Sequence, residues 1–289
     1  MVDGKVTNVP NQLHIYNSET GLLDDNAVRV IRPGQTLTLG ELGIAVGVTS
    51  CSSNDQSVTW TADDTQIVSV NSSTGTVTAG SAKCKATTIT ATSTLGVRST
   101  YIICVTTITL EPQQTEYWCW VASARMFTEN YITVDDEVTQ AKVAYDLGLY
   151  DNENGGNTED ICDAIKKFSN YTLTDIGKTT NSTDIMVLTK TALINTLDEG
   201  NAVCITIKYT ITGGRHALVI VAHCETSEGD SFILFDPGPA HVGTIHIVSY
   251  ETICNGNFTY PTFLGASHVW SGVVAVRNVF NDTSNWIQN

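Results

Sequence analysis

The sequence is poor in charged residues, and the charge it carries is mostly of one sign. Only 16% of its 289 residues are charged, and 30 acidic against 15 basic residues give a net charge of −15. No basic stripe exists to displace counterions from phosphates, which argues against a nucleic-acid partner and against an anionic membrane surface. The acidic excess leaves open an affinity for cationic substrates, beside the simpler interpretation of a soluble acidic exterior.

Long apolar runs are also missing. None reaches the roughly 18 residues that would span a bilayer, and the N-terminal MVDGKVTNVP lacks the basic and apolar regions of a signal peptide. We expect either a cytosolic chain or one whose signal peptide has been removed, and we favour a secreted or cell-surface protein. Sequons fit an extracellular location, although a chain rich in Asn and Thr produces them by chance. They begin at Asn71, Asn170, Asn181, Asn257 and Asn281.

The eight cysteines include no C-x-x-C pair. This spacing argues against a zinc site, and we predict no metal and no other cofactor. Setting Cys119 aside as a candidate nucleophile leaves seven cysteines, so at least one further thiol should be free. One disulfide could stabilise the N-terminal part of the chain, and Cys51 with Cys104 is the preferred pair. Buried reduced thiols are the alternative.

The length favours two hydrophobic cores, and the abundance of Thr, Val and Gly favours β structure. Residues 26–107 alternate short β-branched runs with turn residues every eight to twelve positions, which predicts an all-β sandwich. Trp60 is expected in its core. Residues 1–25 are either a lead-in or an edge strand around LHIY. The predicted strands are AVRVI, QTLTL, GIAVGVTS, SVTWTA, IVSV, TVTAG, TTITATS and TYIICVTTI.

This first region resembles a bacterial immunoglobulin-like domain of group 2. The matching elements are RPGQTLTL, VTWTADDTQIVSVNSSTGTVTAG and ATTITATS. The resemblance implies a spacer, adhesion or presentation module, with a possible ligand at the cell surface and no chemistry of its own.

Residues 108–289 place helical patterns before strand patterns, which predicts an α+β domain with an antiparallel sheet. The helical patterns are VASARMFTENY, VDDEVTQAKVAYDLGLY, TEDICDAIKKFS and IMVLTKTALINTLDEG. The strand patterns are AVCITIKYTI, HALVIVAHC, SFILFDP, TIHIVSY and SGVVAVRNV.

The segment EPQQTEYWCWVASARMF carries the first candidate site residues. Cys119 stands at the opening of a predicted helix, where unpaired N–H groups and the helix dipole stabilise a thiolate. The flanking Trp118 and Trp120 would shield it from water and form part of a substrate cleft. Gln113 is placed to donate its side-chain amide to an oxyanion together with the Cys119 backbone N–H. Spacing favours Gln113 over Gln114 for this role.

A thiolate needs a base and the base needs an orienting partner. His216 opens the apolar strand HALVIVAH after Gly213 and Gly214, and Gly214 would allow a substrate to approach the backbone closely. Asp236 begins the DPG turn at the end of strand SFILF. A hairpin would place these two strands side by side and bring Asp236 to the imidazole, where it would hold one tautomer.

The other histidines are weaker candidates for the base. His223 lies an odd number of residues along the same strand, which predicts the opposite face. His246 has the setting T-I-H-I-V, which reads as ordinary alternation. Surface positions are expected for His14, His241 and His268.

The candidate site residues occur in the order found in papain-like cysteine peptidases. They are Gln113, then Cys119 with Trp118, Trp120 and Ala122, then Gly214-Arg215-His216, and then Asp236-Pro237. The chain is similar to the compact bacterial branch of AvrRpt2-type and C39-like enzymes. The resemblance implies a papain-like fold and peptide-bond hydrolysis through a Cys119 thioester, with Gln113, His216 and Asp236 in the roles given above. The sequence departs from the plant-enzyme signature, because Glu116 replaces its upstream cysteine.

Two other functions use the same residues differently. The thioester could pass its acyl group to an amine rather than to water. In the other alternative the chain is a surface adhesion protein that keeps the peptidase fold for its shape. The complete set of Gln, Cys, His and Asp favours an enzyme acting on a protein or peptide substrate.

Overall fold

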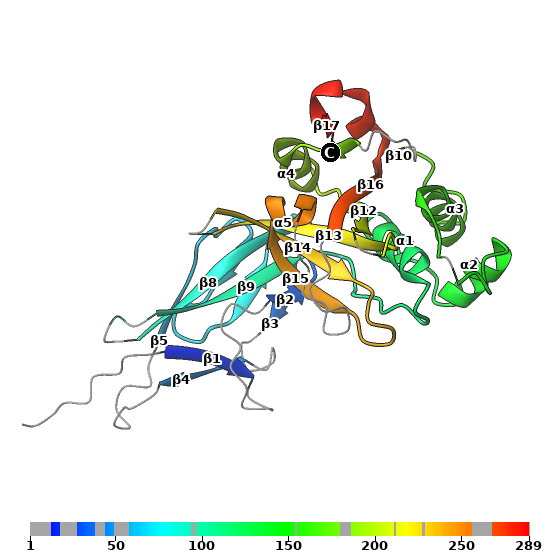
Figure 1. Cartoon of the computed structure of the whole chain (residues 1–289). Helices are drawn as coiled ribbons and strands as arrows, with labels where there is room; N and C mark the ends of the chain where they lie inside the picture. The colour runs from blue at the N-terminus through cyan, green and yellow to red at the C-terminus, as the bar shows by residue number, and fades with distance from the viewer. Residues whose placement is uncertain are drawn as a thin grey trace, which may run out of the picture. The chain divides into compact units, whose positions relative to one another are not determined.

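The computed structural model of the chain is shown in Figure 1. It describes residues 13–17, 28–37, 44–48, 58–93, 96, 98–153, 155–179, 186–210, 212–226, 229–255 and 268–288. Two compact units are present, one formed by Met1–Ala82 with Ala86–Val105 and the other by Lys83–Lys85 with Thr106–Asn289. We describe each unit by itself.

The first unit is built from strands, as the spacing of β-branched runs predicts. β1 pairs antiparallel with β4, and β5 pairs antiparallel with β8. β2 runs parallel to β9, while β3, β7 and β6 form a separate antiparallel sheet. The bounds are β1 Leu13–Asn17, β2 Val28–Ile31, β3 Thr36–Leu37, β4 Ile44–Val48, β5 Val58–Ala62, β6 Val68–Val70, β7 Val77–Ala79, β8 Lys85–Ser93 and β9 Arg98–Val105.

The core of this unit contains Trp60, which is 6% exposed, so its predicted place is confirmed. It packs with aliphatic residues that alternate inward along the strands, as expected for a half-buried sheet. Cys104 is buried in β9. Cys51 lies outside the described residues, so its pairing with Cys104 stays a prediction.

The second unit contains an antiparallel sheet with the order β10-β16-β12-β13-β14-β15. A separate pair joins β11 to β17. This confirms the predicted antiparallel arrangement after the helices. The bounds are β10 Ile176–Lys178, β11 Met186–Leu188, β12 Val203–Tyr209, β13 Arg215–Thr226, β14 Gly229–Asp236, β15 Thr244–Ser249, β16 His268–Val276 and β17 Trp286–Gln288.

Three helices, α1 to α3, precede this sheet and lie together in Figure 1, where α1 packs against α3, β12 and β13. The predicted helix at 134–150 is shorter than expected, since α2 covers only Gln140–Asp146. The pattern from Ile185 to Gly200 is a strand followed by a helix, because Met186–Leu188 pairs with β17. The bounds are α1 Cys119–Glu129, α2 Gln140–Asp146, α3 Thr158–Phe168, α4 Lys190–Asp198 and α5 Tyr250–Asn255, with 3-10 turns at Arg277–Asn281 and Thr283–Asn285.

The helices begin in two different ways. In α3 the Asn157 side chain accepts from the backbone of Asp160, whose carboxylate accepts in return from the Asn157 N–H, which forms a capping box. In α1 the residue before the helix is Trp118, and it makes no side-chain capping hydrogen bond. The first N–H groups of α1 are therefore left for another partner, and Cys119 is the first residue of that turn.

The cysteines in the described part of the chain are all buried. Cys84, Cys119, Cys204 and Cys254 are free and buried, so the prediction of a further free thiol is confirmed. Burial raises the pKa of Cys84 to about 12, and it also raises the pKa values of Cys204 and Cys254. These three thiols stay protonated and unreactive near neutral pH.

The described residues show no sign of a membrane-spanning helix or of a metal site. None of their helices is both long and apolar enough to cross a membrane. No group of three or more His, Cys, Asp or Glu side chains among them is arranged to hold a metal ion.

Replacing Gly272 by alanine should destabilise the second unit. Gly272 faces Thr206 across the β12–β16 pair, and an added Cβ would meet Thr206 Oγ1 at 2.5 Å and Thr158 Cγ2 at 2.9 Å. We expect a loss of about 1–3 kcal/mol in unfolding free energy, as for other overpacked sites, measured by urea denaturation. The control is Gly214→Ala, whose Cβ would come no closer than 3.4 Å to another residue and should cost under about 0.5 kcal/mol. Equal stabilities of the two variants would contradict this packing.

Candidate active site

Cys119 is held at the N-terminal end of α1, and its side chain is almost enclosed. The residue is 8% exposed, and every residue from Cys119 to Thr128 of this helix is buried. The helix is therefore enclosed by the rest of the unit along most of its length. Such an enclosed helix gives the sulfur a fixed position beside unpaired backbone N–H groups.

His216 and Asp236 come from two neighbouring antiparallel strands. His216 is the second residue of β13 and Asp236 is the last residue of β14, and the register pairs Val219 with Phe235. This pairing brings the beginning of one strand beside the end of the other. His216 Nε2 lies 2.6 Å from Asp236 Oδ1. The predicted hairpin thus brings the two side chains into hydrogen-bonding contact.

The Asp236 carboxylate is fully buried and is held by several hydrogen bonds. Besides His216, its Oδ1 accepts from the Gly238 backbone N–H at 2.8 Å. Its Oδ2 lies 3.2 Å from Nε2 of His246 on β15. A buried carboxylate is stable only when donors replace its lost hydration, and the DPG turn and two imidazoles supply them here.

The electrostatic surroundings favour a protonated His216. Burial lowers the pKa of His216, but charge interactions with Asp236 and Cys119 raise it, and hydrogen bonds to both side chains raise it further. The net result is a pKa well above the ordinary value of 6.5. Since Nε2 bonds Asp236, Nδ1 is the ring nitrogen left for Cys119. The Cys119 sulfur, the His216 imidazole and the Asp236 carboxylate therefore form a continuous hydrogen-bonded series.

Gln113 is joined to the turn that follows Asp236. Its backbone N–H donates to Pro237 O at 2.8 Å, and its carbonyl accepts from the His241 N–H at 2.9 Å. The residue is 5% exposed, and within the described part of the chain its buried side-chain oxygen Oε1 has no hydrogen-bond partner. Its side-chain amide is thus buried beside the Asp236 turn without a structural hydrogen bond at its oxygen.

The two tryptophans beside Cys119 are both buried. Trp118 is 4% exposed, and its ring meets Tyr150 edge-on with the ring centres 5.3 Å apart. Trp120 is 1% exposed and lies so close to Gly156 that an added Cβ there would meet the indole at 2.5 Å. Gly214, in contrast, is exposed in the turn before His216, and its carbonyl accepts from the Tyr209 N–H.

His246 also belongs to this site, although the sequence pattern gave it no role there. Its T-I-H-I-V setting looked like plain strand alternation, yet it bonds Asp236 Oδ2 because β15 pairs with β14 and places Leu234 opposite His246. Tyr209 was also missed. Burial raises the pKa of Tyr209, and its hydroxyl also has charge interactions with His216, Asp236 and Cys119. No local motif marks either residue.

The remaining histidines lie elsewhere. A register shift between Ile220 and Ala222 interrupts the alternation used to separate His223 from His216. His223 instead bonds Asp230 at 2.9 Å, and Lys190 bonds the other oxygen of that carboxylate at 2.7 Å.

The expected surface positions of the other three histidines have different outcomes. His268 was wrongly expected at the surface. It is 1% exposed, and its ring bonds the Thr252 carbonyl. His241 is exposed, as expected. The side chain of His14 lies outside the described residues.

This fold and this site define a protein with a cysteine-peptidase-like domain and an immunoglobulin-like domain. The chain belongs to the Peptidase_C39 like family, whose model matches residues 105–257. The model of the bacterial Ig-like domain (group 2) matches residues 29–103. Both resemblances recognised from the sequence are confirmed.

Solved structures with similarity to the chain include fragments of intimin. A mutant intimin of EHEC O157:H7 shares 15% identity over 58% of this chain and 76% of that chain. A C-terminal 282-residue intimin fragment, solved with the intimin-binding domain of the translocated intimin receptor, shares 11% identity over 91% and 66%. Both have a TM-score of 0.24, too low to carry an argument. The comparison with curated proteins finds no match.

Replacing Asp236 by asparagine should lower the pKa of His216, because it removes the carboxylate that opposes the effect of burial. Titration of the His216 ring protons by NMR measures this change. The matched control is Asp230→Asn, which removes the carboxylate beside His223 and should leave the pKa of His216 unchanged. An unchanged His216 pKa in Asp236→Asn would contradict the assigned pairing.

The same pKa shift should appear in the stability of the wild-type protein. Since the folded pKa of His216 is raised, its protonation stabilises the fold fully below about pH 6.5. That contribution is lost as the pH rises through the folded pKa. The difference in unfolding free energy between wild type and Asp236→Asn should therefore shrink toward high pH. A difference that grows with pH would refute this sign.

Proposed function

We propose that the protein is a cysteine peptidase that hydrolyses peptide bonds through a Cys119 thioester. The Cys119 sulfur attacks the scissile carbonyl carbon, and the carbonyl electrons move onto oxygen. As the C–N bond breaks, protonated His216 gives its proton to the leaving amine. Water then attacks the thioester while His216 takes a proton, and the carboxylic acid product leaves with Cys119 restored.

The observation that carries this proposal is the hydrogen bonding of one imidazole to both Cys119 and Asp236. His216 is thereby oriented toward the sulfur by a carboxylate that is itself held by the Gly238 N–H. An imidazolium beside the sulfur favours the thiolate, which is the nucleophilic form. The helix N-terminus at Cys119 acts in the same direction.

Gln113 is proposed as the oxyanion donor. Its buried side chain lies on a segment bonded to the turn of Asp236, and the Cys119 backbone N–H is the second donor. For substrate contact we propose Trp118 and Gly214. Trp120 is 1% exposed and packs against Gly156, so its proposed part in substrate binding is to support the backbone there.

The immunoglobulin-like domain is proposed to present the peptidase at the cell surface or in a secreted protein. The match of residues 29–103 to the bacterial Ig-like domain of group 2 supports this location. Three sequons, at Asn71, Asn170 and Asn281, have exposed asparagines, while Asn181 and Asn257 lie outside the described residues. The proposed partner is a protein or peptide substrate, with a possible surface ligand at the Ig-like domain.

Cys119 should react with iodoacetamide at pH 7 before the other free thiols. We expect labelling at least about 10-fold faster than at Cys84, Cys204 and Cys254, because burial raises the pKa values of those three. Peptide mapping by mass spectrometry gives the rates. Cys119→Ala should abolish cleavage of a proteome-derived peptide library. Undiminished cleavage by that variant, or equal labelling of all four thiols, would refute the proposed nucleophile.

Gln113→Ala should lower kcat by about 10²- to 10³-fold, as loss of one oxyanion donor does in other acyl-transfer enzymes. Gln114→Ala is the matched control, because its side chain is exposed and its structural contact is made by the backbone N–H. It should retain wild-type kcat. Similar losses in the two variants would remove Gln113 from the proposed role.

A further inference from the structure

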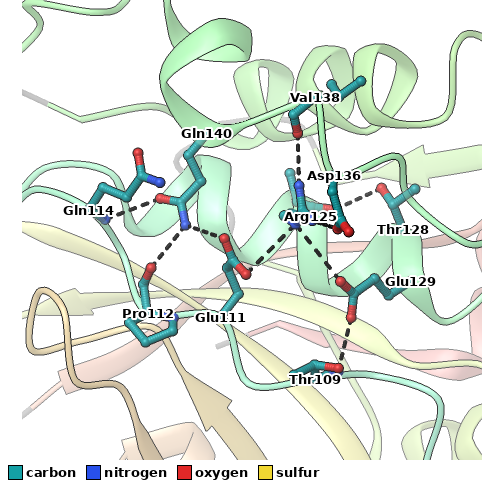
Figure 2. Close-up of polar contacts among 11 residues, drawn as sticks. Thr109, Glu111, Pro112, Gln114, Arg125, Thr128, Glu129, Asp136, Val138 and Gln140 are labelled. Carbon is teal, nitrogen blue, oxygen red and sulfur yellow. Dashed lines mark hydrogen bonds and ion pairs between the residues drawn. The ribbon is translucent and has the colours of Figure 1, made fainter.

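Gln140 is a buried amide whose hydrogen bonds all end on the segment around Gln113. It is the first residue of α2, it is 0% exposed, and it lies outside the set of residues that the chemistry uses directly. A buried side-chain amide must find partners for its donors and its acceptor. Figure 2 shows where these partners lie.

The partners stand on both sides of Gln113. Gln140 Nε2 donates to Pro112 O and to Glu111 Oε1, both at 2.9 Å. Its Oε1 accepts from the Gln114 N–H at 3.2 Å (Figure 2). One side chain therefore binds the backbone immediately before and immediately after Gln113.

The opposite edge of Gln113 is held by different residues. Its own N–H and carbonyl bond Pro237 and His241, in the turn that follows Asp236. Gln113 is thus fixed between that turn and Gln140. Because the backbone is held on both edges, the Cα position of Gln113 is fixed, and this limits where its side-chain amide can lie.

Glu111 connects this arrangement to the helix that carries Cys119. Its Oε2 lies 3.7 Å from Nε of Arg125 on α1, while its Oε1 accepts from Gln140. Arg125 also donates to Val138 O at 2.8 Å, two residues before Gln140 (Figure 2). Arg125 and Gln140 therefore link the start of α2, the Gln113 segment and α1.

We propose that Gln140 is a positioning residue that places the Gln113 side-chain amide for oxyanion stabilisation. The proposal rests on the proposed peptidase function. An oxyanion donor acts only when it lies at hydrogen-bonding distance from the oxygen in the transition state, and a displacement of about 1 Å costs roughly 10²-fold in rate. Gln140 acts through Gln113 and does not touch the substrate.

The test compares wild type with Gln140→Met, which keeps the length and volume of the side chain and removes its three hydrogen bonds. We expect kcat to fall about 10- to 100-fold with KM within threefold. Alkylation of Cys119 by iodoacetamide forms no oxyanion, so its rate should stay within twofold of wild type. A merely structural role would slow both reactions.

A double variant decides whether the effect passes through Gln113. In a Gln113→Ala background, Gln140→Met should cost less than twofold in kcat, since the donor it positions is already absent. Multiplicative losses would overturn the proposal, as would wild-type kcat in Gln140→Met. Lys142→Met is the control on the same helix, because that exposed side chain contacts only Asp146 among the described ion pairs and should leave kcat unchanged.

Two further outcomes are informative. If Gln140→Met does not fold, Gln140→Asn retains an amide one methylene shorter and is held to the same criteria. If wild type cleaves no peptide in the library, the proposed function and this inference both fail. If wild type is active, Cys119→Ala is inactive and Gln140→Met keeps wild-type kcat, then only the role of Gln140 is lost.

Discussion

The site depends on one buried hydrogen bond, between His216 on β13 and Asp236 at the end of β14. An ionised carboxylate with no exposed surface is costly unless donors surround it. The DPG turn supplies a backbone N–H, and His216 and His246 supply ring nitrogens. The charge of Asp236 raises the pKa of His216 well above its ordinary value despite burial, and a protonated His216 is the partner that the proposed Cys119 nucleophile requires.

The same turn also sets the place of Gln113. Its backbone bonds Pro237 and His241, so two hydrogen bonds join the segment of the proposed oxyanion donor to the turn that follows the proposed base-orienting residue. The proposed nucleophile, Cys119, lies six residues after Gln113, at the start of a helix that is buried along most of its length. Arg125, Glu111 and Gln140 connect the two parts through partly buried hydrogen bonds and ion pairs (Figure 2). Supports of this kind limit small displacements, to which catalytic geometry is most sensitive.

Much of the fold could be predicted because its strands are regular. Alternation and turn residues predicted most strands of both units, including the pair that carries His216 and Asp236, but not the short strands β10 and β17. The failures lie in short elements. Met186–Leu188 continues a helical pattern, yet it is a strand because Trp286–Gln288 pairs with it. Tyr250 ends a strand pattern but begins α5. For such short segments, the tertiary partner outweighs the local preference.

The sequence by itself determined the local positions of the site. A cysteine opens an apolar helix, a histidine opens an apolar strand and an aspartate ends the next one, and periodicity is sufficient to read all three. Only the tertiary structure decided which other residues join them. His246 reaches Asp236 through the β14–β15 register, and a shift at Ile220 interrupts the alternation toward His223. Gln140 reaches both sides of Gln113 from α2. These features depend on strand register and on packing between elements, which local patterns do not encode.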